Sequence, residues 1–356
     1  MLDDFVAEKT LAGRAPNTIA QHRWAANRAK ELWGGWPATQ LTYRHLNSQY
    51  LAWQQEGRKQ FRRGQGTTTT DEPLSNRSIE AFHRSVKAAF QLAVNRGLVT
   101  TNPAALATPP SAGEQNLRWW SPEQVGAFIA YDHTTRDLPT GMVDVLADTG
   151  GRRGETTALR WTDLDLEVGT ATIPRQLVVH PDTHKVEARP TKRPRSKSTI
   201  SLHPDTIAAL RQRRAEQSAE RLAMGDGWPG PEDISHDLVF TFPNGRLVRP
   251  DTLTRIIDRM STAAGLPRLT PHGLRHSFAT AALKARVPVE VVAARLGNTV
   301  RVVQEIYAHV IPSDDQAAAQ LVGDLYRAGD KPKRDRRMIA SAGEEDETGE
   351  HRAAAS

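Results

Sequence analysis

Five short segments of the chain carry residue types that could act on a phosphate group. In the first, Thr149-Gly150-Gly151-Arg152-Arg153-Gly154-Glu155, glycines surround arginines at the expected start of a helix. Glycine allows close approach of the backbone, and free N–H groups at a helix start favour an anion, so Arg152 is a candidate phosphate ligand. Taken alone, the segment is better explained as a tight turn with solvated arginines.

The second segment is strongly basic and lies between strand-like stretches. A basic hairpin of this kind can lie along a phosphate backbone, although a solvated loop explains the composition equally well. Six basic residues stand against the single acid Glu187: Lys185, Arg189, Lys192, Arg193, Arg195 and Lys197.

The third segment is Pro271-His272-Gly273-Leu274-Arg275-His276. On a helix, His272 and Arg275 are three residues apart and face the same side. A histidine and an arginine that converge on one point can hold a phosphate and move a proton. An isolated pair with this spacing is more often a core-edge histidine beside a surface arginine.

The last two segments are Leu296-Gly297-Asn298 and Glu305-Ile306-Tyr307-Ala308-His309. A lone tyrosine on an amphipathic helix is usually a packing residue. Tyr307 nevertheless follows Asn298 by nine residues, at the end of an ordered series of polar motifs. Each segment is a weak signal alone, and only their common order and spacing are specific.

Taken in order, the segments resemble the catalytic domain of tyrosine recombinases, over about residues 117–310. That family has a TGxRxGE box, a hairpin lysine, HxxR, a glycine followed by His or Trp, and a tyrosine nine residues further on. Residues 74–103 also resemble, more loosely, the last helix of the family's core-binding domain. The matching site residues in this sequence are Arg152, Lys192, His272, Arg275, Asn298 and Tyr307.

The resemblance implies an enzyme that cleaves and rejoins DNA strands by transesterification, without a cofactor. Arg152 and Arg275 would clamp the phosphate, while Tyr307 would attack to give a 3′-phosphotyrosine and a free 5′-hydroxyl. Lys192 would protonate the leaving oxygen, and His272 would act as base or position phosphate and tyrosine. Four protomers would exchange strands through a Holliday junction, as in an integrase-type site-specific recombinase of a mobile genetic element.

Two of these positions need comment. Lys192 is preferred as general acid because the resemblance places the lysine shortly before the SxxTIxL strand, here residues 196–202, although Lys185 and Lys197 are close by. Asn298 stands where the family has His or Trp. Its amide still donates a hydrogen bond but carries no charge, so we expect weaker transition-state stabilisation and a slower enzyme, not an inert one.

Three other functions compete with a recombinase. A type IB topoisomerase uses a similar residue set to relax DNA as a monomer, but the helical N-terminal region and the spacing from Gly297 to Tyr307 favour a recombinase. A decayed paralogue, suggested by Asn298, would bind specific DNA without forming a covalent intermediate. A merely basic nucleic-acid-binding domain leaves the ordered motifs unexplained.

The elements expected around these motifs are mainly helical, with a small β-sheet, so the fold class is α+β. Apolar residues at helical spacing predict a helix over residues 79–94, and Ser121-Pro122-Glu123-Gln124 has the signature of a capped helix start. We predict a helical core-binding domain (1–108), a linker (109–120), a catalytic domain (121–328) and a disordered tail (329–356). Within them we expect a helix that starts after Pro16-Asn17, a mobile loop over 57–71, a helix tail over 143–148, strands over 170–173, 177–179, 199–202 and 238–242, a helix over 204–214 and short helices to about 326.

Composition favours some binding partners and excludes several kinds of site. The formal net charge is +6, which favours nucleic acid, and the absence of cysteine excludes disulfides, thiolate zinc sites and cysteine nucleophiles. No apolar run is long enough to span a membrane, and the N-terminus lacks a secretory pattern. We expect a cytoplasmic, nucleoid-associated protein without metal that binds double-stranded DNA at a specific attachment or recombination site. A tetramer on DNA and accessory DNA-bending or directionality factors are also expected. Little room remains before residue 17 for the arm-binding domain that integrases of mobile elements often carry, so we expect either that this subclass lacks it or that the chain starts late.

Overall fold

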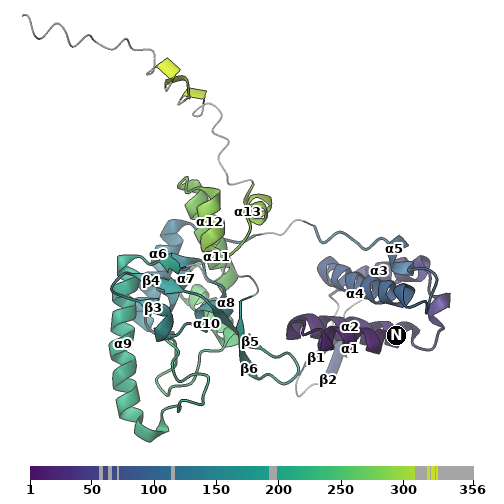
Figure 1. Ribbon diagram of the computed structural model, residues 1–356, viewed down its shortest axis with the longest axis horizontal. Coiled ribbons are helices and arrows are strands. Elements are labelled where there is room, and N and C mark those ends of the chain that lie inside the picture. The colour runs from purple at the N-terminus through teal and green to yellow at the C-terminus, as the bar shows by residue number, and fades with distance from the viewer. Residues whose placement is uncertain are drawn as a thin grey trace, which may run out of the picture. The chain divides into compact units, whose positions relative to one another are not determined.

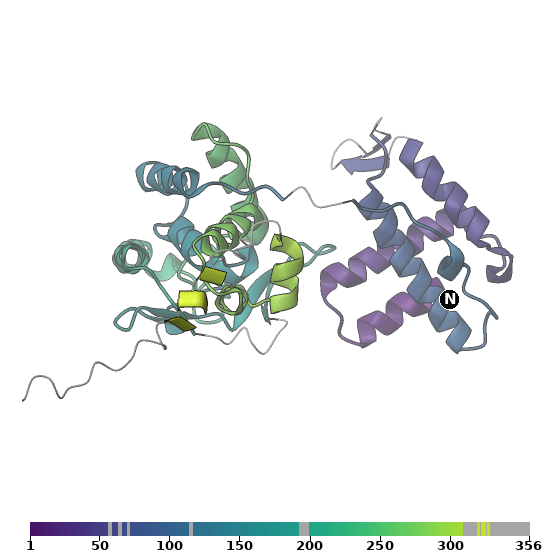
Figure 2. The same ribbon diagram turned by 90° about the horizontal axis from the view of Figure 1, so that it is seen from above.

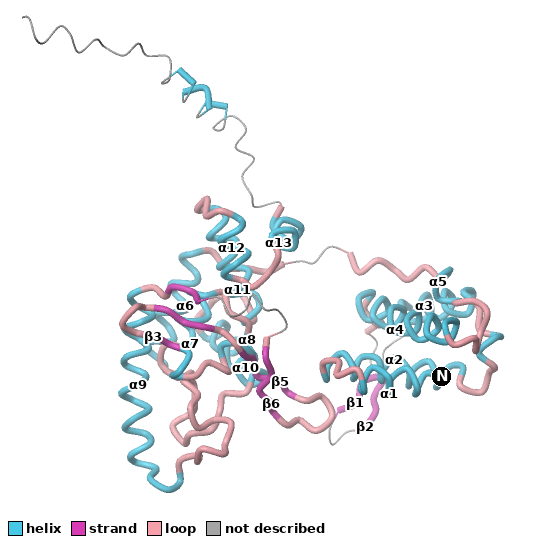
Figure 3. The backbone as a smooth tube through the Cα atoms, viewed as in Figure 1, coloured by secondary structure: helices cyan, strands magenta, loops and turns pink. Residues whose placement is uncertain are grey.

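Helices make up most of the described chain, and the strands form small antiparallel sheets (Figures 1 and 3). The computed structural model divides into two compact units, residues 1–308 and 309–356. It describes residues 1–55, 59–62, 66–69, 72–113, 117–191, 199–308, 319–320, 322–324 and 326–327. The predicted tail, 329–356, therefore lies outside the described residues, and the described positions of the second unit are helical.

The N-terminal elements enclose an apolar core of their own. The helix predicted over residues 79–94 is confirmed as part of α4, on which Ile79, Phe82 and Val86 are at most 1% exposed. Ser75 caps this helix, since its Oγ accepts the Ser78 N–H at 3.3 Å. The elements are α1 (Leu2–Leu11), α2 (Pro16–Trp33), η1 (Ala38–Gln40), α3 (Tyr43–Gln55), β1 (Lys59–Arg62), β2 (Gly66–Thr69), α4 (Asn76–Asn95) and α5 (Pro103–Leu106).

The loop predicted over residues 57–71 is wrong for its described part. Residues 59–62 and 66–69 form β1 and β2, which pair antiparallel from Lys59 opposite Thr69 to Arg62 opposite Gly66. The prediction gave most weight to glycine, whereas the β-branched threonines of this segment favour an extended backbone.

The remaining elements of the first unit, with the turns between them, contain the predicted site residues that the structure describes: Arg152, His272, Arg275, Asn298 and Tyr307. The predicted capping box is present, because Ser121 Oγ accepts from Gln124 N while Gln124 Oε1 accepts from Ser121 N. The helices are α6 (Pro122–Thr135), α7 (Met142–Thr149), α8 (Arg153–Thr156), η2 (Trp161–Asp163), α9 (Pro204–Met224), η4 (Gly225–Gly227), α10 (Pro250–Ala263), α11 (Pro271–Lys284), α12 (Val289–Arg295) and α13 (Val300–Tyr307). The strands are β3 (Leu164–Asp165), β4 (Thr170–Thr172), β5 (Arg175–Val179), β6 (Val186–Pro190) and β7 (Thr199–Ser201).

Three of the predicted strands are confirmed as β4, β5 and β7, and their pairing is antiparallel throughout. One sheet has the order β3-β4-β7, and β5 pairs with β6 in a separate hairpin, with Val179 opposite Val186. The predicted helix over 204–214 is confirmed but longer, since α9 continues to Met224 along the outer edge of this region (Figures 1 and 2).

The strand predicted over residues 238–242 is wrong. Only isolated bridges form there, between Arg160 and Leu238 and between Thr241 and Leu247. Buried side chains of α9 take the carbonyl oxygens that a neighbouring strand would otherwise use: Arg213 donates to the carbonyls of Val239 and Thr241, and Gln217 donates to Leu238 O. Side-chain bonds therefore replace a regular strand partner.

A second apolar core lies beneath α6, α7, α10 and α11. Trp120, at the end of the predicted linker, belongs to it and is 2% exposed. Its backbone N–H donates to Ser277 Oγ at 2.8 Å and its indole N–H to Pro267 O at 3.0 Å, which ties the chain entering this region to α11. The predicted domain boundaries remain a prediction. Among the described residues, the helices are too short or too polar to cross a membrane.

Candidate active site

The turn between α7 and α8 positions Arg152 and depends on glycine. Gly150 has a φ of +59°, in the left-handed region that favours glycine. A Cβ atom there would lie 2.8 Å from Leu296 Cδ2 and 2.8 Å from Phe278 Cδ1. The turn therefore lies directly against α11 and the end of α12.

Arg152 is held by bonds to Glu155 of α8 and to Asn298. Its backbone N–H and its Nη1 donate to the two carboxylate oxygens of Glu155, at 2.9 and 2.6 Å, and the Glu155 side chain is only 8% exposed. Its Nη2 donates to Asn298 Oδ1 at 3.1 Å. The Arg152 side chain remains 40% exposed, so it can contact a ligand while its bonds to Glu155 and Asn298 fix its orientation.

Arg275 is more deeply buried and bonds both to the turn between α7 and α8 and to the end of α12. Thr270 caps α11 by accepting the Gly273 N–H, and Arg275 follows in the second turn of that helix. Its Nη1 donates to Gly150 O at 2.8 Å and its Nη2 to Leu296 O at 2.5 Å. Burial, with a further contribution from the charge of Arg152, lowers the pKa of Arg275 to about 10. The guanidinium therefore stays charged at neutral pH.

Asn298 reaches this cluster from the turn after α12. Gly297 has a φ of +56°, and the Asn298 N–H donates to Ala293 O at 2.9 Å, which closes the end of the helix. The side chain is half-buried and accepts from Arg152. Thus Arg152, Arg275 and Asn298, which were all predicted from the sequence, come together in the structure.

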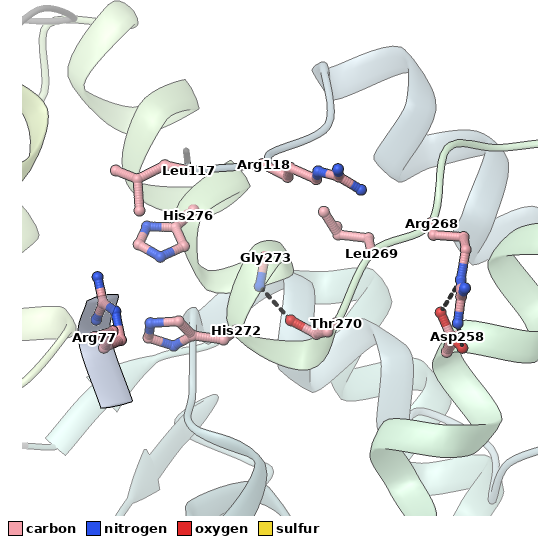
Figure 4. A pocket seen from close by; sticks show the side chains of 10 residues that line it. All are labelled: Arg77, Leu117, Arg118, Asp258, Arg268, Leu269, Thr270, His272, Gly273 and His276. Atoms are coloured by element: carbon pink, nitrogen blue, oxygen red, sulfur yellow. Dashed lines mark hydrogen bonds and ion pairs between the residues drawn. The ribbon is translucent and has the colours of Figure 1, made fainter. Parts of the chain in front are cut away.

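His272 and His276 lie one turn apart on α11 and line the same cavity (Figure 4). Their ring centroids are 4.5 Å apart in an edge-to-face arrangement, at 76° between the ring planes. His272 keeps contact with solvent, whereas His276 is 6% exposed. Partial removal of water, together with the charges of Arg275 and Arg152, lowers the pKa of His272. The imidazole is therefore neutral at physiological pH.

Tyr307 is the last residue of α13, and its hydroxyl points to His276. The Tyr307 Oη and the His276 Nδ1 are 2.6 Å apart, and the tyrosine is 3% exposed. His276 was not among the predicted site residues. The role of base, or of positioning phosphate and tyrosine, was predicted for His272 instead. Its position four residues after His272, on the same helix face, was the available signal.

Lys192 and the alternative Lys197 lie outside the described residues. The hairpin that leads to them is described: β6 ends at Pro190, and Lys185 is exposed between β5 and β6. This hairpin packs against α8, because a Cβ atom at Gly154 would lie 2.6 Å from Leu177 O. The part of the chain that the structure describes contains no cluster of His, Asp or Glu suited to a metal ion.

The model of the phage integrase family matches residues 118–313, which is more than half of the chain. The chain belongs to this family. The predicted family and the predicted enzyme class, DNA strand cleavage and rejoining in site-specific recombination, are thereby confirmed.

Relatives and solved structures agree with this membership. This integrase family member is 26% identical to a tyrosine recombinase XerC-like protein of Caldanaerobacter subterraneus subsp. tengcongensis over 71% of its own chain and 67% of that protein. The chain is also 26% identical to an integrase of Streptomyces ambofaciens, over 72% of this chain and 66% of that protein. It therefore spans about two thirds of the length of these two relatives.

A solved structure is similar in fold. It is the Tn1549 transposon integrase in complex with transposon right end DNA, with a TM-score of 0.70 and 18% identity over 90% of this chain and 98% of that one. The predicted α+β fold class is confirmed.

Proposed function

We propose that this integrase family member recombines DNA at a specific site, with Tyr307 as nucleophile and with Arg152 and Arg275 as the phosphate clamp. The observation that carries the proposal is the shared anchoring of the two arginines. Arg275 bonds to the carbonyls of Gly150 and Leu296, and Arg152 bonds to Asn298, so both guanidinium groups are fixed on the same pair of turns.

The electrostatics of the clamp support a phosphate as its ligand. Burial lowers the pKa of Arg275 and that of His272, and the positive charge of Arg152 adds to both shifts. Positive groups held this close in a partly dry site repel one another until an anion lies between them. A phosphodiester passing through its transition state, where negative charge increases on the non-bridging oxygens, supplies that anion.

The reaction then runs as a transesterification. Tyr307 Oη attacks phosphorus, the bond to the 5′-oxygen breaks, and Lys192 gives that oxygen a proton. The phosphotyrosine conserves the bond energy, so an incoming 5′-hydroxyl can reverse the step with the same residues. Two rounds on paired sites, through a Holliday junction, exchange the strands.

The proposed partners follow from this chemistry. The substrate is double-stranded DNA at an attachment or recombination site, bound with the help of a net charge of +6. Four copies assemble on two such sites, with DNA-bending or directionality factors as accessory partners. The proposed place of action is the cytoplasm, at the nucleoid.

A suicide-substrate assay tests the nucleophile. Candidate attachment-site duplexes carry a nick close to the cleavage point, so that the released 5′-hydroxyl fragment diffuses away and the covalent product accumulates. We expect wild type to give a protein–DNA adduct that survives denaturation and Tyr307→Phe to give none. Tyr43→Phe, which changes an exposed tyrosine on α3, is the matched control and should form the adduct at the wild-type rate.

Two outcomes would contradict the proposal. Adduct formed by Tyr307→Phe would place the nucleophile elsewhere. Specific DNA binding without any adduct from wild type would indicate a decayed, binding-only protein, and relaxation of plasmids that lack recombination sites would indicate a topoisomerase.

A further inference from the structure

The contact between Tyr307 and His276 is short, buried and made at the reacting atom. The Oη and Nδ1 atoms are 2.6 Å apart, and the two residues are 3% and 6% exposed. The ring centroids lie 5.7 Å apart, so the two side chains also pack against each other. A hydrogen bond in such a dry place restrains the phenol more strongly than one in water.

The direction of this hydrogen bond follows from the two ionisation equilibria. Burial raises the pKa of Tyr307 to about 12, so the phenol keeps its proton at neutral pH. Burial, with His272 and Arg275 as further causes, lowers the pKa of His276 to about 4, so that imidazole is neutral. The phenol therefore donates and Nδ1 accepts, which places the proton of the neutral ring on Nε2.

We propose that His276 is the residue that orients the Tyr307 hydroxyl and takes up its proton during attack on phosphorus. The inference rests on the proposed function, since it concerns the activation of the same nucleophile. It assigns to His276 the role of base, which was one of the two roles that the family resemblance suggested for His272. His272, which faces solvent and packs edge-to-face on His276, is left to contact the phosphate.

The proton balance of the step is complete with these residues. As the bond from Tyr307 Oη to phosphorus forms, the phenolic proton moves to His276 Nδ1. As the bond from phosphorus to the 5′-oxygen breaks, Lys192 gives a proton to that oxygen. In the rejoining step His276 returns its proton to the phenol, and Lys192 regains the other from the attacking 5′-hydroxyl.

Substrate binding makes this transfer favourable. In the free enzyme His276 is a weak base, because burial and the positive charge of Arg275 disfavour its protonation. A phosphate held by Arg152 and Arg275 brings negative charge beside the imidazole and offsets that effect. Activation of Tyr307 is thus coupled to the presence of DNA, and the free enzyme keeps its nucleophile protonated.

Single-turnover cleavage of the suicide substrate, with His276→Asn and His276→Ala, tests the proposal. Asparagine places an amide oxygen near the Nδ1 position, so it can accept the hydrogen bond but cannot take up the proton. We expect His276→Asn to cleave ~10²–10⁴-fold more slowly, the usual range for loss of a general base, and His276→Ala to be slower again. The matched control is His83→Asn, which changes a buried histidine whose Nδ1 lies 3.0 Å from the Tyr50 hydroxyl; it should cleave normally.

A second substrate separates the base from the acid. A 5′-bridging phosphorothiolate has a leaving sulfur that needs no proton. It should restore cleavage by Lys192→Ala but leave His276→Asn slow, because the phenolic proton still has no acceptor. Restoration of His276→Asn by this substrate would overturn the assignment.

The pH dependence distinguishes a base from a merely structural residue. The wild-type rate should fall at acid pH as His276 becomes protonated in the DNA complex, and this acid limb should be missing in His276→Asn. Wild-type rates in His276→Asn, or an acid limb that persists there, would overturn the inference. If Tyr307→Phe still forms the adduct, the proposed function itself is wrong. If Tyr307→Phe forms no adduct but the His276 variants cleave at the wild-type rate, Tyr307 remains the nucleophile and His276 is not its base.

Discussion

Arg152 donates through Nη2 to the amide oxygen of Asn298 at 3.1 Å, across 146 positions of sequence. Because the oxygen of the amide is engaged by the guanidinium, its NH₂ group is the part available to a phosphate. The unusual residue at this position is thus integrated into the clamp, which argues for a working site.

The first prediction concerns this amide. Asn298→Ala removes one phosphate donor and one partner of Arg152, so single-turnover cleavage should fall by ~10²-fold. Asn298→His places at this position one of the two residues typical of the family. It should cleave faster than wild type, because an imidazolium adds positive charge at the transition state. A rate for Asn298→Ala equal to that of wild type would show that the amide does not contact the phosphate.

The second prediction concerns Arg275. Lysine has one nitrogen in place of the two that donate to the carbonyls of Gly150 and Leu296, so Arg275→Lys should lower cleavage by ~10²–10³-fold and the free energy of unfolding by ~1.5–3 kcal/mol. Adduct formation and urea unfolding measure the two effects. Arg153→Lys, at an exposed arginine bonded to Thr254, is the control and should change neither.

The third prediction separates backbone conformation from close packing at Gly150. Gly150→Ala and Gly265→Ala both place a side chain at positive φ, at a cost of about 1–2 kcal/mol. Only at Gly150 would the new Cβ collide with Leu296 and Phe278, which should add ~1–3 kcal/mol; nothing lies within 4 Å of a Cβ at Gly265. Equal urea midpoints for the two variants would contradict the packing argument. Gly150→Ala should also cleave slowly, since its carbonyl anchors Arg275.

The fourth prediction is a pH dependence of stability. Burial, reinforced by Asp144, raises the pKa of Asp132 to about 7 from an ordinary value of 3.8, and its Oδ1 has no hydrogen-bond partner in the described structure. The folded protein therefore binds more protons than the unfolded chain between about pH 4 and 7, so this group lowers stability as the pH rises through that window. Asp132→Asn removes the effect and should gain ~1–3 kcal/mol at pH 8 relative to wild type, with little gain at pH 4.5.

Urea unfolding of both proteins at the two pH values measures this difference. Asp205→Asn, at an exposed acid on α9, should show no such pH-dependent gain. An equal gain for Asp132→Asn at pH 8 and at pH 4.5 would mean that the carboxyl group does not titrate in this window.

Part of the candidate site could be proposed from the sequence. Arg152, Arg275, Asn298 and Tyr307 were proposed because their order and spacing resemble the motif series of tyrosine recombinases, and the structure brings the first three together. Their partners could not be proposed in this way, because the carbonyls that Arg275 binds belong to turns brought together only by tertiary packing. His276 was missed for a similar reason: helical spacing gives its face, but its distance to α13 depends on how two helices pack.

The errors in secondary structure have the same origin. Residues 238–242 have a strand-like pattern, yet the buried side chains of Arg213 and Gln217 supply the hydrogen bonds that a neighbouring strand would provide. Local propensity says nothing about such partners from a distant helix. At residues 59–62 and 66–69 the error is purely local, since composition was read as loop where the β-branched threonines favour a strand.

The bonds that complete the clamp join residues far apart in the chain, Gly150 to Arg275 across 125 positions and Arg152 to Asn298 across 146. Ribosomes make proteins from the N-terminus at about 5–20 residues per second. A contact between residues far apart in the chain can form only after the later residue has been synthesised. In the proposed mechanism, a nascent chain has no clamp until Asn298 has been synthesised and no nucleophile until Tyr307 follows. In that mechanism, copies that end before Tyr307 cannot cleave DNA.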